Sequence, residues 1–356
     1  MRVLILNIKK LAIPFLFLLF FTYITWHLSK SLVTALPFKN ARAIITWNDF
    51  LNFKTVFLSI IIEALPFILI GVLVSAILEN FLSEETIRKV LPGNRILNIF
   101  LACFLGIIFP VCECGIVPVA RRLVSKGVPL YSAITFMLAA PIINPVVASS
   151  TAVAFSANPK IVWFRLGLAF FVSFVTGLLL SYWFDSSELK RGIVQNFYYC
   201  GCDHEHHDHH HNSQPTFKTK IINTFQSACD EFFDMGKYLI MGASLAAIAQ
   251  TFVSRDIILN IGQNSLSSIA AMMTFAFGVS VCSSADAFIA ASFATNFTTG
   301  SLLAFMVFGP MIDMKNNLML LNAFKARFVI ALVMIVSLLV IGSTLLINIV
   351  SVGGFR

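Results

Sequence analysis

The sequence predicts an all-α, polytopic transmembrane helical bundle of two sequence-related halves with broken or re-entrant helices. Three observations predict it: an apolar composition, a series of long apolar runs and an internal repeat. Of the 356 residues, 58% are hydrophobic and only 12% are charged, whereas about a quarter of an ordinary soluble chain is charged. This composition excludes a soluble enzyme, a disordered chain and a fibrous protein.

The charge pattern also fits a membrane protein. Lys and Arg number 25 against 17 Asp and Glu, for a net charge of +8. The basic residues are scattered in pairs between apolar runs, such as Lys9-Lys10, Arg88-Lys89 and Arg121-Arg122, which is the pattern of loop charges that orient a chain in the bilayer. The lipid bilayer is therefore the expected partner. A nucleic-acid partner, which needs a clustered basic face, is not expected.

The first apolar run, Leu11–Leu28, has two interpretations. It follows Lys9 and Lys10 and precedes small residues at 33–35, as the core of a cleaved signal peptide does. The alternative is a first transmembrane helix that stays attached, which is favoured because the run is long and many more runs follow. Residues 1–54 are then an N-terminal transmembrane helix with its connecting segment.

Eight further apolar runs are long enough to cross or enter a bilayer core of about 30 Å. They are 55–78, 96–119, 128–155, 161–184, 232–253, 266–290, 301–324 and 328–350. A polar linker at 185–224 separates the first four from the last four. The expected organisation is a first transmembrane repeat at 55–184 and a second transmembrane repeat at 225–356.

The two sets of runs resemble each other in sequence. Three stretches of the first set align in the same order on three stretches of the second, at offsets of 169 to 171 residues. The aligned stretches are Glu63 with Gly71 on Asp234 with Gly242, Val111-Cys112 on Val281-Cys282, and 135–144 on 304–313. The nearly constant offset predicts a duplication, and related halves in transporters hold the substrate site between them.

The relative orientation of the halves depends on how many segments cross. If all four segments of each half cross, the halves are parallel, and if one per half is re-entrant, they are inverted. The basic loop at 121–126 has an uncharged counterpart at 291–297, which favours inversion by the positive-inside rule. The loops near Lys160 and Lys325 are both basic, which argues the other way. Inversion is the interpretation we favour.

The stretch 109–118 carries the most chemical information. Pro110, Gly115 and Pro118 interrupt the helix inside an apolar run, and freed backbone groups are tolerated there only against protein or a wet cavity. Cys112, Glu113 and Cys114 lie in the same interruption. The cysteines alone could be small buried hydrophobes. A carboxylate at this depth is expensive and usually functional, so Glu113 favours a binding site.

Two further interruptions lie at matching positions of the two repeats, at Pro141–Pro145 and at Pro310. Paired breaks of this kind are the best sequence indication of a transporter's binding site. Asn144 and Asp313 are aligned and could both supply oxygen ligands. The alternative is a pair of kinks whose backbone groups are satisfied, and Lys315 could then be a loop residue outside the membrane.

More acidic residues lie inside the apolar runs. Glu63 is within the run 55–78, and Asp286 follows Cys282 closely. Asp234 and Lys237 are three residues apart and could pair on one helix face. Acidic groups at membrane depth suit proton relays and cation paths, so Glu63, Asp234 and Lys237 are candidates for proton or counter-charge handling.

The linker contains a tract of imidazoles and thiols. Its candidate metal ligands are Cys200, Cys202, His204, His206, His207, His209, His210 and His211. These side chains suit Zn²⁺, Ni²⁺ or copper, and the spacing is that of a flexible chelating tract. The alternative is a solvated linker with incidental metal affinity. No cofactor is required, and zinc or another transition metal at this tract is the one cofactor that the sequence allows.

The motifs together resemble those of the predicted-permease family, the YraQ and ArsP group with its YcgR-like members. The matching stretches are Glu63–Phe67, Phe109–Pro118 with Arg121-Arg122, Leu138–Pro145, Cys282–Phe288 and Phe308–Lys315. The resemblance implies a multi-pass permease of the cell (inner or plasma) membrane. It also implies a small membrane partner protein. One branch of the group exports trivalent organoarsenicals through thiol ligands, and Cys112, Cys114 and Cys282 lie approximately at such positions.

These observations lead to a functional hypothesis. We expect a secondary permease, an exporter of a soft or borderline metal ion or a thiol-reactive metalloid compound, and not an enzyme. The predicted substrate-binding residues are Cys112, Glu113, Cys114, Asn144, Cys282, Asp286 and Asp313. ATP drive within the chain is not expected, because no GxxxxGK[ST] phosphate loop is present. The alternatives are an ion channel, which paired breaks also permit, and a membrane thiol-redox protein using the Cys112–Cys114 pair.

Overall fold

The computed structural model of the chain describes residues 47–81, 94–108, 112–184, 188, 217–252 and 265–352. The elements within these residues are all α-helices. The first apolar run, Leu11–Leu28, and the cysteine and histidine tract at 200–211 lie outside the described residues. The predicted all-α class is therefore confirmed for the part of the chain that the structure describes.

Among the described residues, six helices lie before the linker and six after it. Those before the linker are α2 (Trp47–Phe81), α4 (Arg95–Ile108), α5 (Glu113–Ser125), α6 (Leu130–Ala139), α7 (Pro145–Ala154) and α8 (Lys160–Trp183). Those after it are α10 (Phe217–Phe252), α12 (Ser265–Val279), α13 (Asp286–Ser292), α14 (Thr299–Met311), α15 (Met314–Ala323) and α16 (Ala326–Val352). Helix α10 begins inside the segment predicted as linker.

Three of the described helices contain a stretch long and apolar enough to cross a membrane. These stretches are Phe50–Ile77 of α2, Lys160–Trp183 of α8 and Ala326–Ile349 of α16. The chain is therefore a membrane protein by length and composition of its helices. Four predicted apolar runs each correspond to two shorter helices. The break between α12 and α13 contains no proline, so the sequence did not indicate it.

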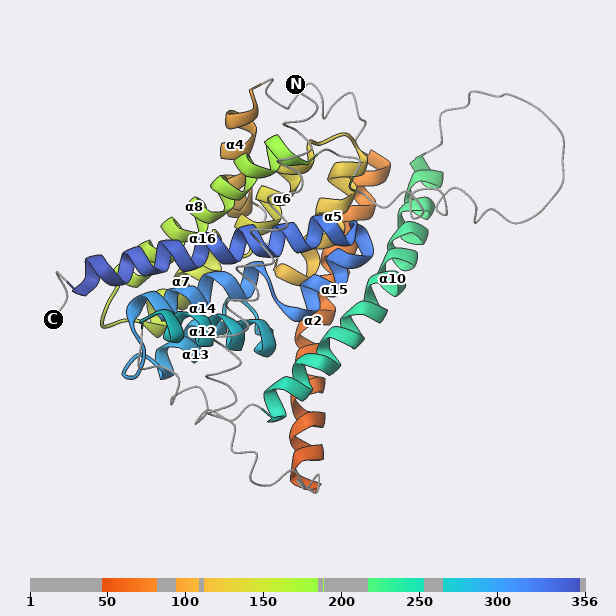
Figure 1. Cartoon of the computed structure of the whole chain (residues 1–356). Helices are drawn as coiled ribbons and strands as arrows, with labels where there is room; N and C mark the ends of the chain where they lie inside the picture. Colours follow the sequence, from red (N-terminus) through yellow and green to blue (C-terminus); the bar gives the residue numbers. More distant parts are fainter. Residues whose placement is uncertain are drawn as a thin grey trace, which may run out of the picture.

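The long helices α2 and α10 pack side by side in opposite directions (Figure 1). Near the end of α2, Ser75 Oγ donates a hydrogen bond to Glu231 Oε2 in the first half of α10, at 2.8 Å. Near the start of α2, Ile60 packs with Ala243 and Ala246 in the second half of α10. Contacts that run in opposite order along the two helices define an antiparallel pair.

The helices α8 and α16 form a second antiparallel pair. Phe184, which follows α8, stacks edge-on against Phe328 near the start of α16, with ring centroids 5.3 Å apart. Phe171 in the first half of α8 shares a shallow groove with Ile347 near the end of α16. Helices α6 and α14 lie beside this pair. They supply much of the buried apolar core, including the fully buried Leu138 and Leu303.

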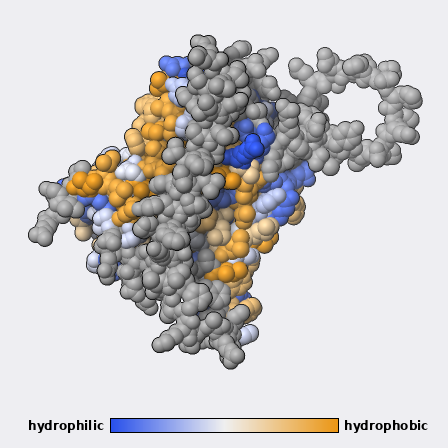
Figure 2. Space-filling view, in the orientation of Figure 1, coloured by the Kyte–Doolittle hydropathy of each residue, from blue (hydrophilic) through white to orange (hydrophobic). Residues whose placement is uncertain are grey.

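Apolar side chains also cover much of the outer surface. Figure 2 shows a hydrophobic area over α4, where Phe100, Leu101 and Phe104 are exposed. Exposed phenylalanines and leucines at this density are unfavourable in water and are the expected lining of a lipid-facing surface. The surface therefore agrees with the membrane location that the helix lengths indicate.

Candidate functional site

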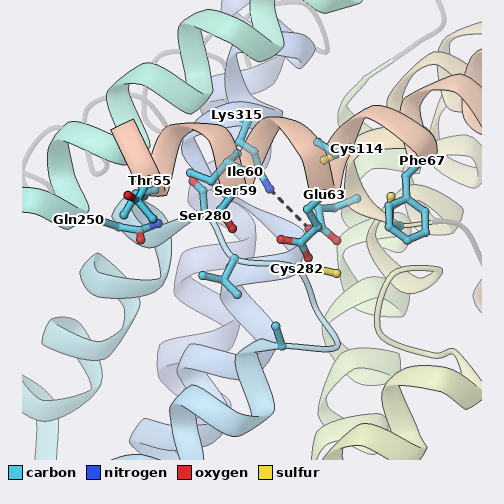
Figure 3. Close-up of a pocket in the computed structure, with 16 residues that line it drawn as sticks. Thr55, Ser59, Ile60, Glu63, Phe67, Cys114, Gln250, Ser280, Cys282 and Lys315 are labelled. Atoms are coloured by element: carbon cyan, nitrogen blue, oxygen red, sulfur yellow. Dashed lines mark ion pairs between the residues drawn. The ribbon is translucent and has the colours of Figure 1, made fainter. Parts of the chain in front are cut away.

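A cavity of about 350 Å³ opens beside the first half of α2 (Figure 3). It is lined by thiols, carboxylates, an ammonium group, hydroxyls and apolar side chains. The lining residues are Thr55, Val56, Ser59, Ile60, Glu63, Ala64, Phe67, Cys112, Glu113, Cys114, Gln250, Ser280, Val281, Cys282, Ala285 and Lys315. Thus Glu63 and four predicted binding residues, Cys112, Glu113, Cys114 and Cys282, share one cavity.

The start of α5 forms one wall of the cavity. The carbonyl of Cys112 accepts hydrogen bonds from the N–H groups of Gly115 and Ile116, both at 3.2 Å. Helix α5 therefore begins within the predicted interruption, and Gly115 and Pro118 lie inside the helix instead of breaking it. Glu113 is 1% exposed. Helix α2 packs so closely on this wall that a Cβ atom added to Gly71 would lie 2.5 Å from Gly115 Cα. Only glycine fits there.

The start of α13 forms the facing wall with the same local geometry. The carbonyl of Cys282 accepts hydrogen bonds from the N–H groups of Ala285 and Asp286, at 2.9 and 3.0 Å. Its thiol lies 3.3 Å from Ser284 Oγ. The loop from 280 to 285 therefore presents Cys282 to the cavity in the way that the α5 break presents Cys112.

Ser280 connects this loop to the next helix break. Its φ angle of 48° is in the left-handed region, which is unfavourable for a residue with a Cβ atom. Its hydroxyl accepts a hydrogen bond from the N–H of Met314 at 3.3 Å. Backbone strain of this kind is concentrated at binding and switching sites, and here it lies in the lining of the cavity.

Lys315 provides the cationic group of the site. It is 3% exposed, and its ammonium nitrogen lies 3.7 Å from Glu113 Oε1 and 3.6 Å from Asp313 Oδ2. A buried charge needs such partners, since removing it from water without them is strongly unfavourable. Figure 3 shows Lys315, Glu63 and Cys282 turned toward the same space. Lys315 therefore belongs to the site and is not a loop residue.

The aligned residues Asn144 and Asp313 both begin a helix. Asn144 Oδ1 accepts a hydrogen bond from the N–H of Val146 at 2.9 Å, and Asp313 Oδ1 accepts one from the N–H of Asn316 at 2.6 Å. Side-chain acceptors at this position satisfy the free N–H groups of a helix start. Asn144 is not among the residues that line the cavity, and Asp313 reaches it only through Lys315.

Asp286 lies in a separate buried ion pair. Its carboxylate Oδ2 accepts a hydrogen bond from Arg165 Nη2 of α8 at 2.8 Å. The same guanidinium donates to Thr151 Oγ1 at 2.8 Å and to the carbonyl of Ser283 at 3.0 Å. Arg165 and Asp286 are 1% and 2% exposed. The structure therefore separates Asp286 from the cavity, although it follows Cys282 by only four residues.

Asp234 and Lys237 pair with each other outside the cavity. Their side chains are 2.6 Å apart on one face of α10, as the spacing of three predicts. Asp234 also faces Arg121 of α5 at 3.7 Å and accepts a hydrogen bond from Asn322 of α15 at 3.1 Å. This group lies one to two helical turns beyond the cavity along α5.

The sequence analysis missed four buried cations. It assigned Arg121 and Arg122 to a loop, but both lie in α5 and are 5% and 8% exposed. Arg165 lies within the apolar run 161–184, so its charge at membrane depth was the signal that could have found it. Lys315 follows Asp313 in a predicted break, which was the corresponding signal there. No three His, Cys, Asp or Glu side chains form a metal-ligand group among the described residues.

Comparison with known proteins identifies the kind of protein. Residues 49–349 match the family described as "Predicted permease". The chain belongs to the predicted permease family. This permease is 47% identical to the UPF0718 protein YcgR of Bacillus subtilis over 301 residues, which are 85% of this chain and 98% of that protein. The family resemblance predicted from the motifs is confirmed.

A second relative extends the comparison. The permease is 41% identical over 294 residues to a Streptococcus mutans protein named "Putative two-component membrane permease complex subunit", which covers 83% of this chain and 94% of that protein. No solved structure matches the chain. The relatives therefore support a membrane permease, and the geometry of its site comes from the structure described above.

Proposed function

We propose that the protein is a secondary permease that exports a soft or borderline metal ion, or a thiol-reactive metalloid compound, through the cavity beside α2. One observation carries the proposal: thiols from two separate helix starts, Cys112 and Cys114 at the start of α5 and Cys282 just before α13, line the same cavity. Thiolates are the preferred ligands of soft cations. A site at helix breaks is also where transporters bind substrate.

We infer that the transmembrane part consists of two duplicated halves. The starts of α4, α6 and α7 are followed 169 or 170 residues later by the starts of α12, α14 and α15. The hydrogen bonds at Cys112 and Cys282 and the caps at Asn144 and Asp313 repeat with the same offsets. This agreement in bounds and local hydrogen bonds supports the repeat that the sequence predicts.

The same comparison supports inverted halves. Helix α2 corresponds to α10, and α8 corresponds to α16. Both pairs are antiparallel. Because α8 and α16 are both candidate spans, counterpart spans run through the bilayer in opposite directions. Inverted repeats of this kind place the substrate site near the midplane between the halves.

The chain is thereby proposed to be a multi-pass protein of the cell membrane, with the short helix pairs completing broken or re-entrant spans between the long helices. The relative from Streptococcus mutans is named as a subunit of a two-component complex. This supports a small membrane protein as a second component here. Neither the multi-pass arrangement nor the second component requires ATP, a resident cofactor or a chemical reaction on the substrate.

Reconstituted vesicles test the transport proposal. Purified protein is inserted into liposomes, and the flux of Zn²⁺ and of a trivalent arsenical is measured with and without a proton gradient. We expect saturable, gradient-coupled flux that falls strongly in Cys282→Ser. Flux that rises linearly with concentration, without saturation, would instead indicate a channel.

Cys103→Ser is the matched control for Cys282→Ser. Cys103 is a fully buried thiol of α4 that does not line the cavity. Its loss should leave flux unchanged, because it only packs as a small apolar group. Equal flux in the wild type, Cys282→Ser and Cys112→Ser would contradict thiol ligation of the substrate.

A further inference from the structure

The α2–α10 pair packs against only one of two equivalent places that the duplicated halves offer. Helix α2 packs on α5, and α10 packs on α15. Exchanging the halves turns these contacts into α10 on α13 and α2 on α7. Among the described helices, neither of these exchanged pairs makes a contact of comparable extent. The structure is therefore asymmetric in the position of this helix pair.

Side-chain exposure shows the same asymmetry. Helix α10 covers Lys315, since a Cβ atom on Gly242 would lie 2.7 Å from Lys315 Cα, and Lys315 is 3% exposed. The counterpart of Gly242 is Gly71, and the counterpart of Lys315 is Val146, which is 57% exposed. The surface of α7 that α2 would cover after an exchange is thus open.

A cluster of four charged residues, of which Arg121, Arg122 and Glu231 are buried and Asp234 is partly exposed, holds the pair in its present place. Arg121 Nη1 of α5 lies 3.7 Å from Asp234 Oδ2 of α10, and Arg122 Nε lies 3.6 Å from Glu231 Oε2. Glu231 is fully buried and also accepts the hydrogen bond of Ser75 from α2. We call Arg121, Arg122, Glu231 and Asp234 the charged cluster. It joins both halves beyond the cavity.

The counterparts of the charged cluster lie at the open side. By the repeat offsets, Glu231 and Asp234 correspond to Ile60 and Glu63, and both of these line the cavity. Arg121 and Arg122 correspond to Ala291 and Ser292, which carry no charge. The side that holds the cavity therefore lacks the ion pairs that close the equivalent place in the other half.

We propose that the charged cluster is the closed gate of the transport path, and that α2 and α10 move together from α5 and α15 to α13 and α7. This movement would open the gate and cover the cavity with Ile60 and Glu63. The inference rests on the proposed transport function. Its test measures distances between helices and not flux, so the gate proposal and the transport proposal can each fail without the other. Helix packing with two alternative positions converts small local shifts into a switch between two states.

Cross-linking measures the two positions directly. Cysteine pairs are introduced into the full-length chain with its native cysteines replaced by serine, and a protease site is placed in the linker, so that only a cross-link keeps the two halves joined. With a short bismaleimide, we expect a product from Arg121→Cys with Asp234→Cys, which reports the present position. We also expect a weaker product from Glu63→Cys with Ala291→Cys, which reports the exchanged position.

Neutralising the gate should change the second product. In Arg121→Gln/Arg122→Gln, the yield from positions 63 and 291 should rise severalfold, because the present position loses its ion pairs. The pair Ile60→Cys with Ala246→Cys lies within α2–α10 and should give an unchanged yield. Lys325→Gln is the matched control, because it removes an exposed ion pair with Glu188 that includes no residue of the charged cluster.

Two results would overturn the inference. One is a yield from positions 63 and 291 that is the same with and without the arginine substitutions. The other is an equal rise in Lys325→Gln. If the double arginine variant does not fold, as a lost 60–246 product would reveal, Glu231→Gln is measured in its place and the same two outcomes decide.

Discussion

Two buried ion pairs, one at the start of α13 and one at the start of α5, differ in how tightly they are held. Where α13 meets α7 and α8, Arg165 and Asp286 form a hydrogen-bonded pair at 2.8 Å, completed by Thr151 and the carbonyl of Ser283. Where α5 meets α15, Lys315 lies 3.6 to 3.7 Å from two carboxylates and lines a cavity.

The difference indicates a division of roles. The guanidinium of Arg165 is sealed in the core with a fixed set of partners, so it has little freedom to exchange them. Lys315 is buried just as deeply, but its longer ion-pair distances and the adjacent cavity leave room for a substrate or proton to replace it. We therefore interpret the Arg165 pair as structural and the Lys315 group as part of transport.

Breaking the Arg165 pair should have the largest effect. Asp286→Asn leaves a buried guanidinium without its counter-charge and should lower the free energy of unfolding by about 3–5 kcal/mol. Thermal unfolding of the detergent-solubilised protein measures this. In the double variant Arg165→Met/Asp286→Leu, an apolar pair should restore most of the stability. A stable Asp286→Asn protein that has lost only flux would reverse the assignment of roles.

Glu113→Gln should separate transport from folding. The amide keeps the shape of the side chain but removes a charge from the Lys315 group, so the protein should fold while flux falls by about tenfold or more, equivalent to about 1.4 kcal/mol. Flux and thermal unfolding are measured on the same preparation. Equal losses of stability in Glu113→Gln and Asp286→Asn would remove the distinction between the two ion pairs.

Gly242→Ala probes the contact that covers Lys315. The added methyl group would meet the backbone of α15 at 2.7 Å and should lower the free energy of unfolding by about 1–3 kcal/mol. Gly167→Ala is the control, because nothing lies within 4 Å of its added Cβ. If both variants unfold at the temperature of the wild type, the close approach of α10 to α15 is not needed for stability.

Deleting residues 200–211 should have the smallest effect on transport. Cys112, Cys114 and Cys282 already supply thiols to the cavity, so flux in vesicles should persist, while retention on a nickel or zinc column should be lost with the histidines. A large loss of zinc-dependent flux in the deletion variant would instead show that the tract delivers the metal. An arsenical flux measured in parallel would separate delivery from the transport path itself.

Part of this site was predictable because its signals are local. An apolar run is interrupted within a few residues by Pro110, Cys112, Glu113 and Cys114. The free-energy cost of a carboxylate at membrane depth is enough to indicate a functional stretch there. The prediction of an all-α membrane permease is confirmed. The roles of the individual binding residues stay predictions. Asn144 was predicted by the same reasoning, but in the structure its side chain caps the start of α7.

The sequence by itself determined the apolar composition, the positions of the main breaks and the family motifs, because these depend on residue type and short spacing. Only the tertiary structure decided which charges meet. Arg165 and Asp286 are 121 residues apart in the chain, and Lys315 pairs with Glu113 from the opposite side of the linker. Pairing over such sequence separations follows from how the helices pack. Cys282 lines the cavity, whereas Asp286, four residues later in the same motif, pairs with Arg165 outside it.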